Sequence, residues 1–276
     1  MALAVGIVGL PNVGKSTLFN ALTHAQNAEA ANYPFCTIEP NKATVPLSDA
    51  RLDALAKIVK PAQIIKATVD FIDIAGLVRG ASKGEGLGNK FLANIRETDA
   101  IIQVVRRFTD EDVMHVEGGI DPVRDIETIE TELVLADMQS LEKRIDRVGR
   151  QARADKELRK EVEAMESLMK HFDAGHPART YPRGEADPIG NTLAELQMIT
   201  DKPVIYCANV GENDLSGESA HVARIREHAT KKGCDMVVIS AKMEAELAGL
   251  SDAEREDFLA SYGLKESGLD QTVRMA

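Results

Sequence analysis

The nine residues from Gly9 to Thr17 carry the clearest chemistry in the chain. They fit the pattern G-x-x-x-x-G-K-[ST], which cradles phosphate groups. The glycines allow a tight turn, so that successive N–H groups can converge on one anion. Lys15 is the expected cation for the β- and γ-phosphates, and the Ser16 hydroxyl is the expected Mg²⁺ ligand. The loop therefore predicts a nucleoside triphosphate site with contacts from Asn12, Val13, Gly14, Lys15, Ser16 and Thr17.

Two further segments are predicted to complete the phosphate and metal site. The apolar run Ala67–Gly76 ends in D-x-x-G, so Asp73 is expected to hold Mg²⁺ through water and the Gly76 amide to bond the γ-phosphate. Thr37 lies in a turn-rich loop, where its hydroxyl is the candidate to complete the metal shell and sense the γ-phosphate. The alternative is a hydrogen bond to its own backbone. The predicted metal ligands are Ser16, Thr37 and Asp73.

Two strand ends in the second half of the chain are predicted to meet the base. In position they correspond to the base-reading elements of small GTP-binding proteins, where an aspartate accepts two hydrogen bonds from guanine. Glu212 stands at that position here, and a carboxylate facing adenine would meet a ring acceptor. We therefore expect Glu212 to swing away and neighbouring residues to contact the base, a change that weakens guanine recognition without selecting adenine. The predicted base set is Asn209, Val210, Glu212, Ser240 and Ala241.

The elements that must position these residues alternate between strand and helix patterns. A helix is predicted from Ser16 to Ala25, and an amphipathic helical region from Met243 to Gly263. This alternation predicts an α/β fold with an open, mostly parallel sheet covered on both faces. The predicted strands are Leu3–Val8, Ala67–Gly76, Ala100–Val105, Pro203–Asn209 and Met236–Ser240.

Between residues 121 and 190 the apolar spacing becomes helical. Apolar side chains recur from Ile126 to Val148 and again from Leu158 to Phe172, with a polar break near residues 151–155. Two long helices in an antiparallel hairpin account for this pattern. The tip, from Lys143 to Lys160, carries eight basic and three acidic side chains. Such a tip suits contact with ribosomal RNA; the alternative is a solvated helix face.

The composition limits the size of the core and the classes of protein to which the chain can belong. The 276 residues are 44% hydrophobic, enough for one large core or a core with an appended element. The net charge of −11 argues against a general nucleic-acid coat protein. We find no signal peptide and no bilayer-spanning run, so a cytoplasmic protein, with no membrane partner and monomeric, is expected. The odd, widely spaced cysteines are expected to be reduced thiols: Cys36, Cys207 and Cys234.

The order of these motifs resembles the translation-factor (TRAFAC) class of GTP-binding folds. More narrowly, the amino-acid sequence of three segments resembles the YchF family, the Obg-like ATPases: Gly9–Thr17, Asn32–Asn41 and Asp73–Phe91. The resemblance implies a P-loop NTPase domain of the Obg type, ATP preferred over GTP, a coiled-coil arm inserted in the nucleotide domain, and association with the ribosome. Arg107 precedes Phe108 where the family usually has cysteine, so thiol-based regulation at that position is not expected.

The resemblance also implies a domain plan. Residues 1–120 and 191–276 are expected to form the nucleotide-binding domain, and residues 121–190 the inserted helical arm. Family members continue past a stretch like Glu266–Asp270 into a small TGS domain, whereas this chain stops at Ala276. We therefore expect the TGS domain to be absent.

Hydrolysis is expected to be slow. Ras-like enzymes place a water-orienting glutamine after D-x-x-G, and Leu77 stands there in this chain. Asn12 is the residue type that in related enzymes helps to hold a K⁺ ion in place of an arginine finger; the alternative is an asparagine that stabilises the loop turn. The predicted catalytic residues are Lys15, Asn12 and Gly76. Two alternatives stay open: a GTPase of the same architecture, and a nucleotide-dependent interaction module without significant hydrolysis.

Overall fold

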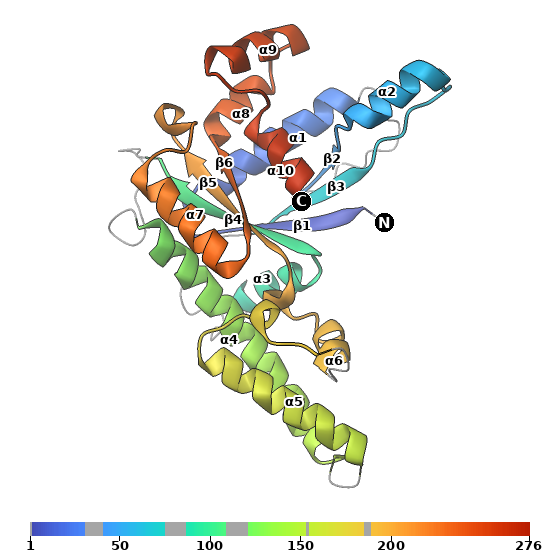
Figure 1. Ribbon diagram of the computed structural model, residues 1–276, viewed down its shortest axis with the longest axis vertical. Helices are drawn as coiled ribbons and strands as arrows, with labels where there is room; N and C mark the ends of the chain where they lie inside the picture. The colour runs from blue at the N-terminus through green and yellow to red at the C-terminus, as the bar shows by residue number, and fades with distance from the viewer. Residues whose placement is uncertain (1, 31–40, 75–86, 109–120, 153–154, 185–188) are drawn as a thin grey trace. The chain divides into compact units, whose positions relative to one another are not determined.

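The computed structural model describes residues 2–30, 41–74, 87–108, 121–152, 155–184 and 189–276. By its internal contacts the chain divides into two units, which are drawn in Figure 1. The sheet unit contains Met1–Gly76, Thr98–Val123 and Val204–Ala276, and the helical unit contains Leu77–Glu97 and Arg124–Pro203.

Within the described residues, six strands of the sheet unit form one sheet in the order β2-β3-β1-β4-β5-β6. All neighbours are parallel except β2, which pairs antiparallel with β3. The mostly parallel sheet is therefore confirmed. β2 is not among the strands that the periodicity predicts, because its five residues end in proline and give a weak strand signal. The strands are β1 Leu3–Val8, β2 Lys42–Pro46, β3 Thr68–Asp73, β4 Ala100–Arg107, β5 Val204–Val210 and β6 Asp235–Ile239.

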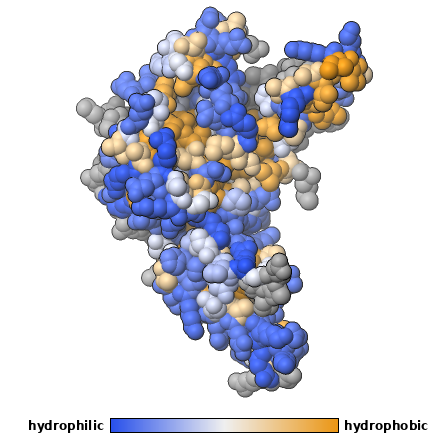
Figure 2. Space-filling view, in the orientation of Figure 1, coloured by the Kyte–Doolittle hydropathy of each residue, from blue (hydrophilic) through white to orange (hydrophobic). Residues whose placement is uncertain are grey.

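The middle of the sheet is buried on both faces. Every residue of β5 and all but the last of β4 are buried, as expected for parallel strands with helices on either side. Helix α1 (Lys15–Ala30) packs against β1, β2, β3 and α8 (Ala241–Leu247), and α7 (Ala220–Lys232) packs against β5 and β6. The unit also contains α2 (Ala50–Val59), α9 (Asp252–Ser261) and α10 (Gly268–Met275). Hydrophobic residues are exposed on α2, at Leu55, Ile58 and Val59 (Figure 2).

The predicted helical region from Met243 to Gly263 is two helices, α8 and α9. Ser251 starts α9 with a capping box, in which its backbone N–H donates to Glu254 Oε2 at 2.9 Å. Ser251 and Glu254 thus mark the start of a second helix within the predicted region. The region is helical as predicted, but it is not one continuous helix.

The helical unit is built around a long hairpin. Helix α4 (Pro122–Gly149) and helix α5 (Lys156–Asp173) supply the apolar residues that the spacing predicts. Asp155 ends the connecting turn, because its Oδ1 accepts from the Glu157 backbone N–H at 2.9 Å and caps α5. Although α4 has 28 residues, no described helix is apolar enough to cross a membrane. The unit also contains α3 (Leu87–Arg96), α6 (Ile189–Glu195) and the 3₁₀ turns Ala178–Thr180 and Ile199–Asp201.

Candidate nucleotide-binding site

The phosphate-loop motif connects the end of β1 to the start of α1. Gly14 has φ +94°, and a Cβ there would collide with the side-chain amide nitrogen of Asn209. At Gly9 a Cβ would lie 2.6 Å from the Val104 carbonyl oxygen. Asn12 has φ +62°, a conformation that asparagine tolerates better than most residues. The backbone path therefore requires the two glycines and favours asparagine at position 12.

Lys15 opens α1 with a side chain that is only 7% exposed. Its Nζ donates a hydrogen bond to the Leu10 carbonyl at 2.7 Å, which holds the ammonium under the loop. Burial lowers the pKa of Lys15 to about 8, and the nearby Asp73 carboxylate partly opposes this change. A cation that is desolvated in this way gains much from an arriving phosphate.

Asp73 ends β3, in register with Ile7 of β1, and so lies at the same edge of the sheet as the loop. Its Oδ1 is buried and has no hydrogen-bond partner among the described residues. Burial raises the pKa of Asp73, while Lys15 lowers it. A buried oxygen without a donor fits a hydrated Mg²⁺, which prefers one or two carboxylates together with water and phosphate.

The other predicted phosphate and metal residues divide into two groups. Ser16 and Thr17 are exposed in the first turn of α1, and Val13 is buried beneath the loop. Thr37 and Gly76 lie outside the described residues, as does Leu77. The described residues contain no group of three or more His, Cys, Asp or Glu side chains that could hold a metal by themselves.

The Asn209 side chain links the phosphate loop to α8 through two hydrogen bonds. It is 4% exposed; its Nδ2 donates to the Val13 carbonyl at 2.9 Å, and its Oδ1 accepts from the Ala241 N–H at 3.0 Å. Ser240 is also buried and caps α8 through Met243 N. Within the predicted base set, Asn209 therefore holds the phosphate loop in place, with both ends of its amide engaged in the protein.

Glu212 differs from the rest of that set. It is exposed just after β5, and its Oε1 accepts a hydrogen bond from Lys242 Nζ at 2.9 Å. Val210 and Ala241 are buried. The carboxylate at the guanine-reading position is therefore engaged with a lysine of α8.

Arg106 is a site residue that belongs to none of the sequence motifs. It lies in β4, is 3% exposed and donates to the Asn12 carbonyl at 3.5 Å and to the Phe108 carbonyl at 3.2 Å. Its guanidinium lies 4.5 Å from the centre of the Phe108 ring. A Cβ on Gly14 would lie 3.7 Å from that ring. The signal in the sequence is a charged residue that directly follows an apolar strand run.

Known proteins resemble this chain over most of its length. Residues 4–141 match the family described as 50S ribosome-binding GTPase. The chain is 49% identical over 277 residues to "Ribosome-binding ATPase YchF" of Bacillus subtilis, covering 99% of this chain and 75% of that protein. It is 51% identical over 281 residues to the protein of the same name from Haemophilus influenzae, with the same coverage. The solved "Structure of the Schizosaccharomyces pombe YchF GTPase" superposes with a TM-score of 0.86 at 34% identity, covering 99% of this chain and 74% of that one.

Proposed function

Because the chain belongs to the YchF family of P-loop nucleoside triphosphatases, we propose that it is a Mg²⁺-dependent, slowly hydrolysing ATP switch that associates with the ribosome. The observation that carries the nucleotide part is the pair of Lys15 and Asp73. A largely buried ammonium and a buried carboxylate oxygen without a hydrogen-bond donor lie near enough for the pKa of each group to respond to the other. The Lys15 ammonium suits the phosphate oxygens of a Mg²⁺ nucleotide, and the unpartnered Asp73 oxygen suits the hydrated metal ion.

The phosphates are bound by the loop N–H groups, by Lys15 and by the first turn of α1. Ser16, Asp73 and Thr37 are the residues that would hold Mg²⁺, whose chemistry is to neutralise charge that develops on the phosphate oxygens. Gly76 is the proposed γ-phosphate sensor. Catalysis by this chain is then mainly positioning by Lys15, Asn12 and the loop, and turnover is slow because Leu77 cannot orient water. A K⁺ ion near Asn12 is the proposed supplement.

ATP is the proposed substrate because the family resemblance implies it, and the state of the guanine-reading position weakens the case for GTP. Glu212 is drawn to Lys242, which leaves less of its carboxylate for the two donors of guanine. The bacterial relatives are named ATPases, whereas the fission-yeast structure is titled a GTPase, so GTP is the second candidate. Contacts to the base are proposed from the backbone that follows Val210 and Ser240, because the side chains of Val210 and Ala241 are buried.

Ribosome association is proposed from the names of the relatives and from charge. Lys143, Arg147 and Arg150 are exposed on the tip, while the whole chain carries a net charge of −11. Arginine and lysine that neutralise phosphates dominate affinity for RNA. We also propose that residues 121–190 act as one arm on the nucleotide domain, and that the protein works as a cytoplasmic monomer.

The test is calorimetric titration of the nucleotide-free protein with non-hydrolysable ATP and GTP analogues in Mg²⁺. We expect ATP to bind at least about tenfold more tightly, which is about 1.4 kcal/mol. Lys15→Ala should abolish binding of both analogues, and the exposed Lys57→Ala should leave both unchanged. Equal or tighter binding of the GTP analogue would reject the proposed preference for ATP and favour the GTPase.

A further inference from the structure

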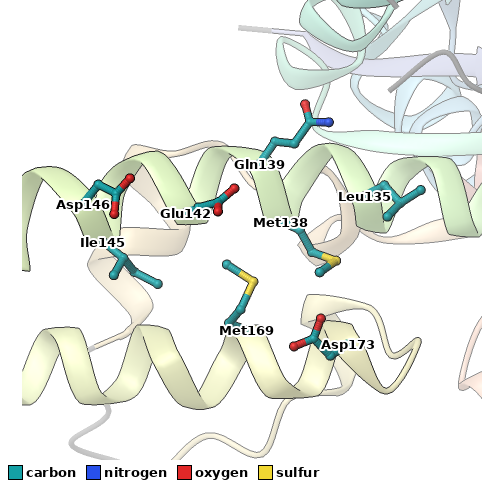
Figure 3. Close-up of a pocket in the computed structure, with 8 residues that line it drawn as sticks. All are labelled: Leu135, Met138, Gln139, Glu142, Ile145, Asp146, Met169 and Asp173. Carbon is teal, nitrogen blue, oxygen red and sulfur yellow. The ribbon is translucent and has the colours of Figure 1, made fainter. Parts of the chain in front are cut away.

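The helical hairpin carries a groove that the nucleotide site does not use. It lies between α4 and α5, has a volume of about 440 Å³ and is shown in Figure 3. Apolar side chains form its floor and carboxylates form its rim. Its lining residues belong entirely to the helical unit.

The floor is made of flexible apolar side chains. Met138 of α4 and Met169 of α5 point toward one another across the gap, with Ile145 beside them (Figure 3). All three are partly buried against the hairpin core. Methionine is unbranched and polarisable, so a methionine-lined floor adapts to apolar side chains of different shapes.

The rim is acidic and its charges are uncompensated. Glu142 and Asp146 of α4 and Asp173 of α5 are all exposed, and none forms an ion pair within the described part of the chain. By contrast, Arg144 of the same hairpin is paired with Glu161 at 3.1 Å. The exposed Lys143 and Arg147 are close in sequence to these carboxylates but do not line the groove, so its lining is acidic and attracts a cationic ligand.

The groove also has the length of a short helix. Its lining on α4 runs from Leu135 to Asp146 in helical steps, which corresponds to about 16 Å or three turns. An amphipathic helix presents anchors at i, i+3, i+4 and i+7 over the same length. We propose that this groove binds a basic amphipathic helix of a partner protein, with aliphatic anchors between the methionines and lysine or arginine against the rim.

The probe for this proposal is an amidated leucine–lysine peptide of about 15 residues with its leucines at helical spacing. A scrambled peptide of equal charge is the ligand control. Binding is followed by fluorescence anisotropy, and the location by the ¹³C-methyl NMR signals of the methionines. We expect the methyl signals of Met138 and Met169 to shift, and the helical peptide to bind at least about tenfold more tightly than the scrambled one.

Matched variants distinguish peptide binding at the groove from attraction to the overall negative charge of the protein. The groove variant is Glu142→Gln with Asp146→Asn and Asp173→Asn. The control variant, Glu127→Gln with Glu163→Gln and Glu256→Gln, removes the same charge from exposed positions outside the lining. The groove variant should weaken binding at least about tenfold and the control variant by less than about twofold.

A further variant tests the floor alone. Met169→Gln keeps the acidic rim and should also weaken binding several-fold, because charge attraction without an apolar anchor is not sufficient. Equal binding by the groove and control variants would overturn the proposal, as would methyl shifts away from Met138 and Met169. An RNA oligonucleotide that shifts these two signals, or self-association that the groove variant abolishes, would assign the groove to RNA or to a second copy instead.

Discussion

Arg96, the last residue of α3, forms an ion pair with the fully buried Asp137 of α4, with 3.3 Å between Nη1 and Oδ1. The same guanidinium donates to the Leu196 carbonyl at 3.1 Å. Asp137 also accepts from the backbone N–H groups of Ile199 at 3.0 Å and Thr200 at 2.7 Å. Because α3 follows the D-x-x-G segment in the chain, this network joins the helix after the predicted γ-phosphate sensor to the arm.

Removing the Asp137 carboxylate should destabilise the helical unit strongly. Asp137→Ala leaves the Arg96 charge and two buried N–H groups without their acceptor, so we expect a loss of about 3–5 kcal/mol in the free energy of unfolding. Asp137→Asn should lose less, because its amide oxygen can still accept. Urea unfolding followed by circular dichroism measures both. The exposed Glu127→Ala is the control, and equal stability of Asp137→Ala and this control would contradict the network's importance.

Asn209 should act on the phosphates through the loop. Asn209→Ala removes the bonds to Val13 and Ala241 and should weaken ATP binding by about tenfold, or 1.4 kcal/mol. Inorganic tripolyphosphate has no base, so a positioning role predicts the same loss for it. Calorimetry with both ligands distinguishes the roles, and the exposed Asn191→Ala is the control. A loss confined to ATP would mean that Asn209 contacts the base.

Nucleotide affinity should depend on the proton of Lys15. Its pKa is about 8 in the unliganded protein, and only the protonated amine pairs with phosphate. Bound phosphate raises that pKa, so affinity should be constant below about pH 7 and fall by up to about tenfold per pH unit above 8. Titrations between pH 7 and 10, in buffers of different ionisation enthalpy, measure the affinity and the proton uptake. Lys15→Arg keeps its charge and should give a flat profile; a flat wild-type profile would contradict this role.

Glu244 should make folding stability fall as pH rises. It is 2% exposed, accepts from the Gly268 N–H at 2.8 Å at the start of α10, and burial raises its pKa to about 7. The unfolded pKa is 4.5, so the folded state binds the proton more tightly. This contribution is complete below pH 4.5 and is lost through pH 7, at a cost of up to about 3 kcal/mol. Glu244→Gln should remove that slope in urea unfolding; an unchanged slope would show that other groups cause it.

The tip should carry the charge that ribosomes recognise. Lys143→Gln with Arg147→Gln and Arg150→Gln should reduce co-sedimentation with ribosomes, and it should lower the dependence of binding on salt by about three counterions. The control is the substitution of three exposed lysines outside the arm by glutamine: Lys57, Lys231 and Lys265. If both triple variants lose binding equally, the tip is not the contact.

Local sequence was sufficient to identify the loop, the parallel strands and the hairpin. A phosphate loop is one short run of residues, so its motif is visible in the sequence. Strands and helices are predicted by the spacing of apolar side chains, which also depends only on residues close in sequence. β2 is missed for the same reason, because five residues ending in proline carry little periodicity. Membership of 77–97 in the helical unit has no local signal either, since it rests on contacts such as Arg96 with Asp137.

Only the tertiary structure decided what the buried polar residues do. Asn209 reads as a base contact in the sequence, yet its amide is engaged by Val13, 196 residues away, and by Ala241. Arg106 directly follows a predicted strand and belongs to no motif, yet it donates to the Asn12 carbonyl of the loop. A buried polar group must find a partner because leaving it unsatisfied costs free energy. Which distant segment provides that partner depends on the packing of the sheet, and a linear pattern does not contain it.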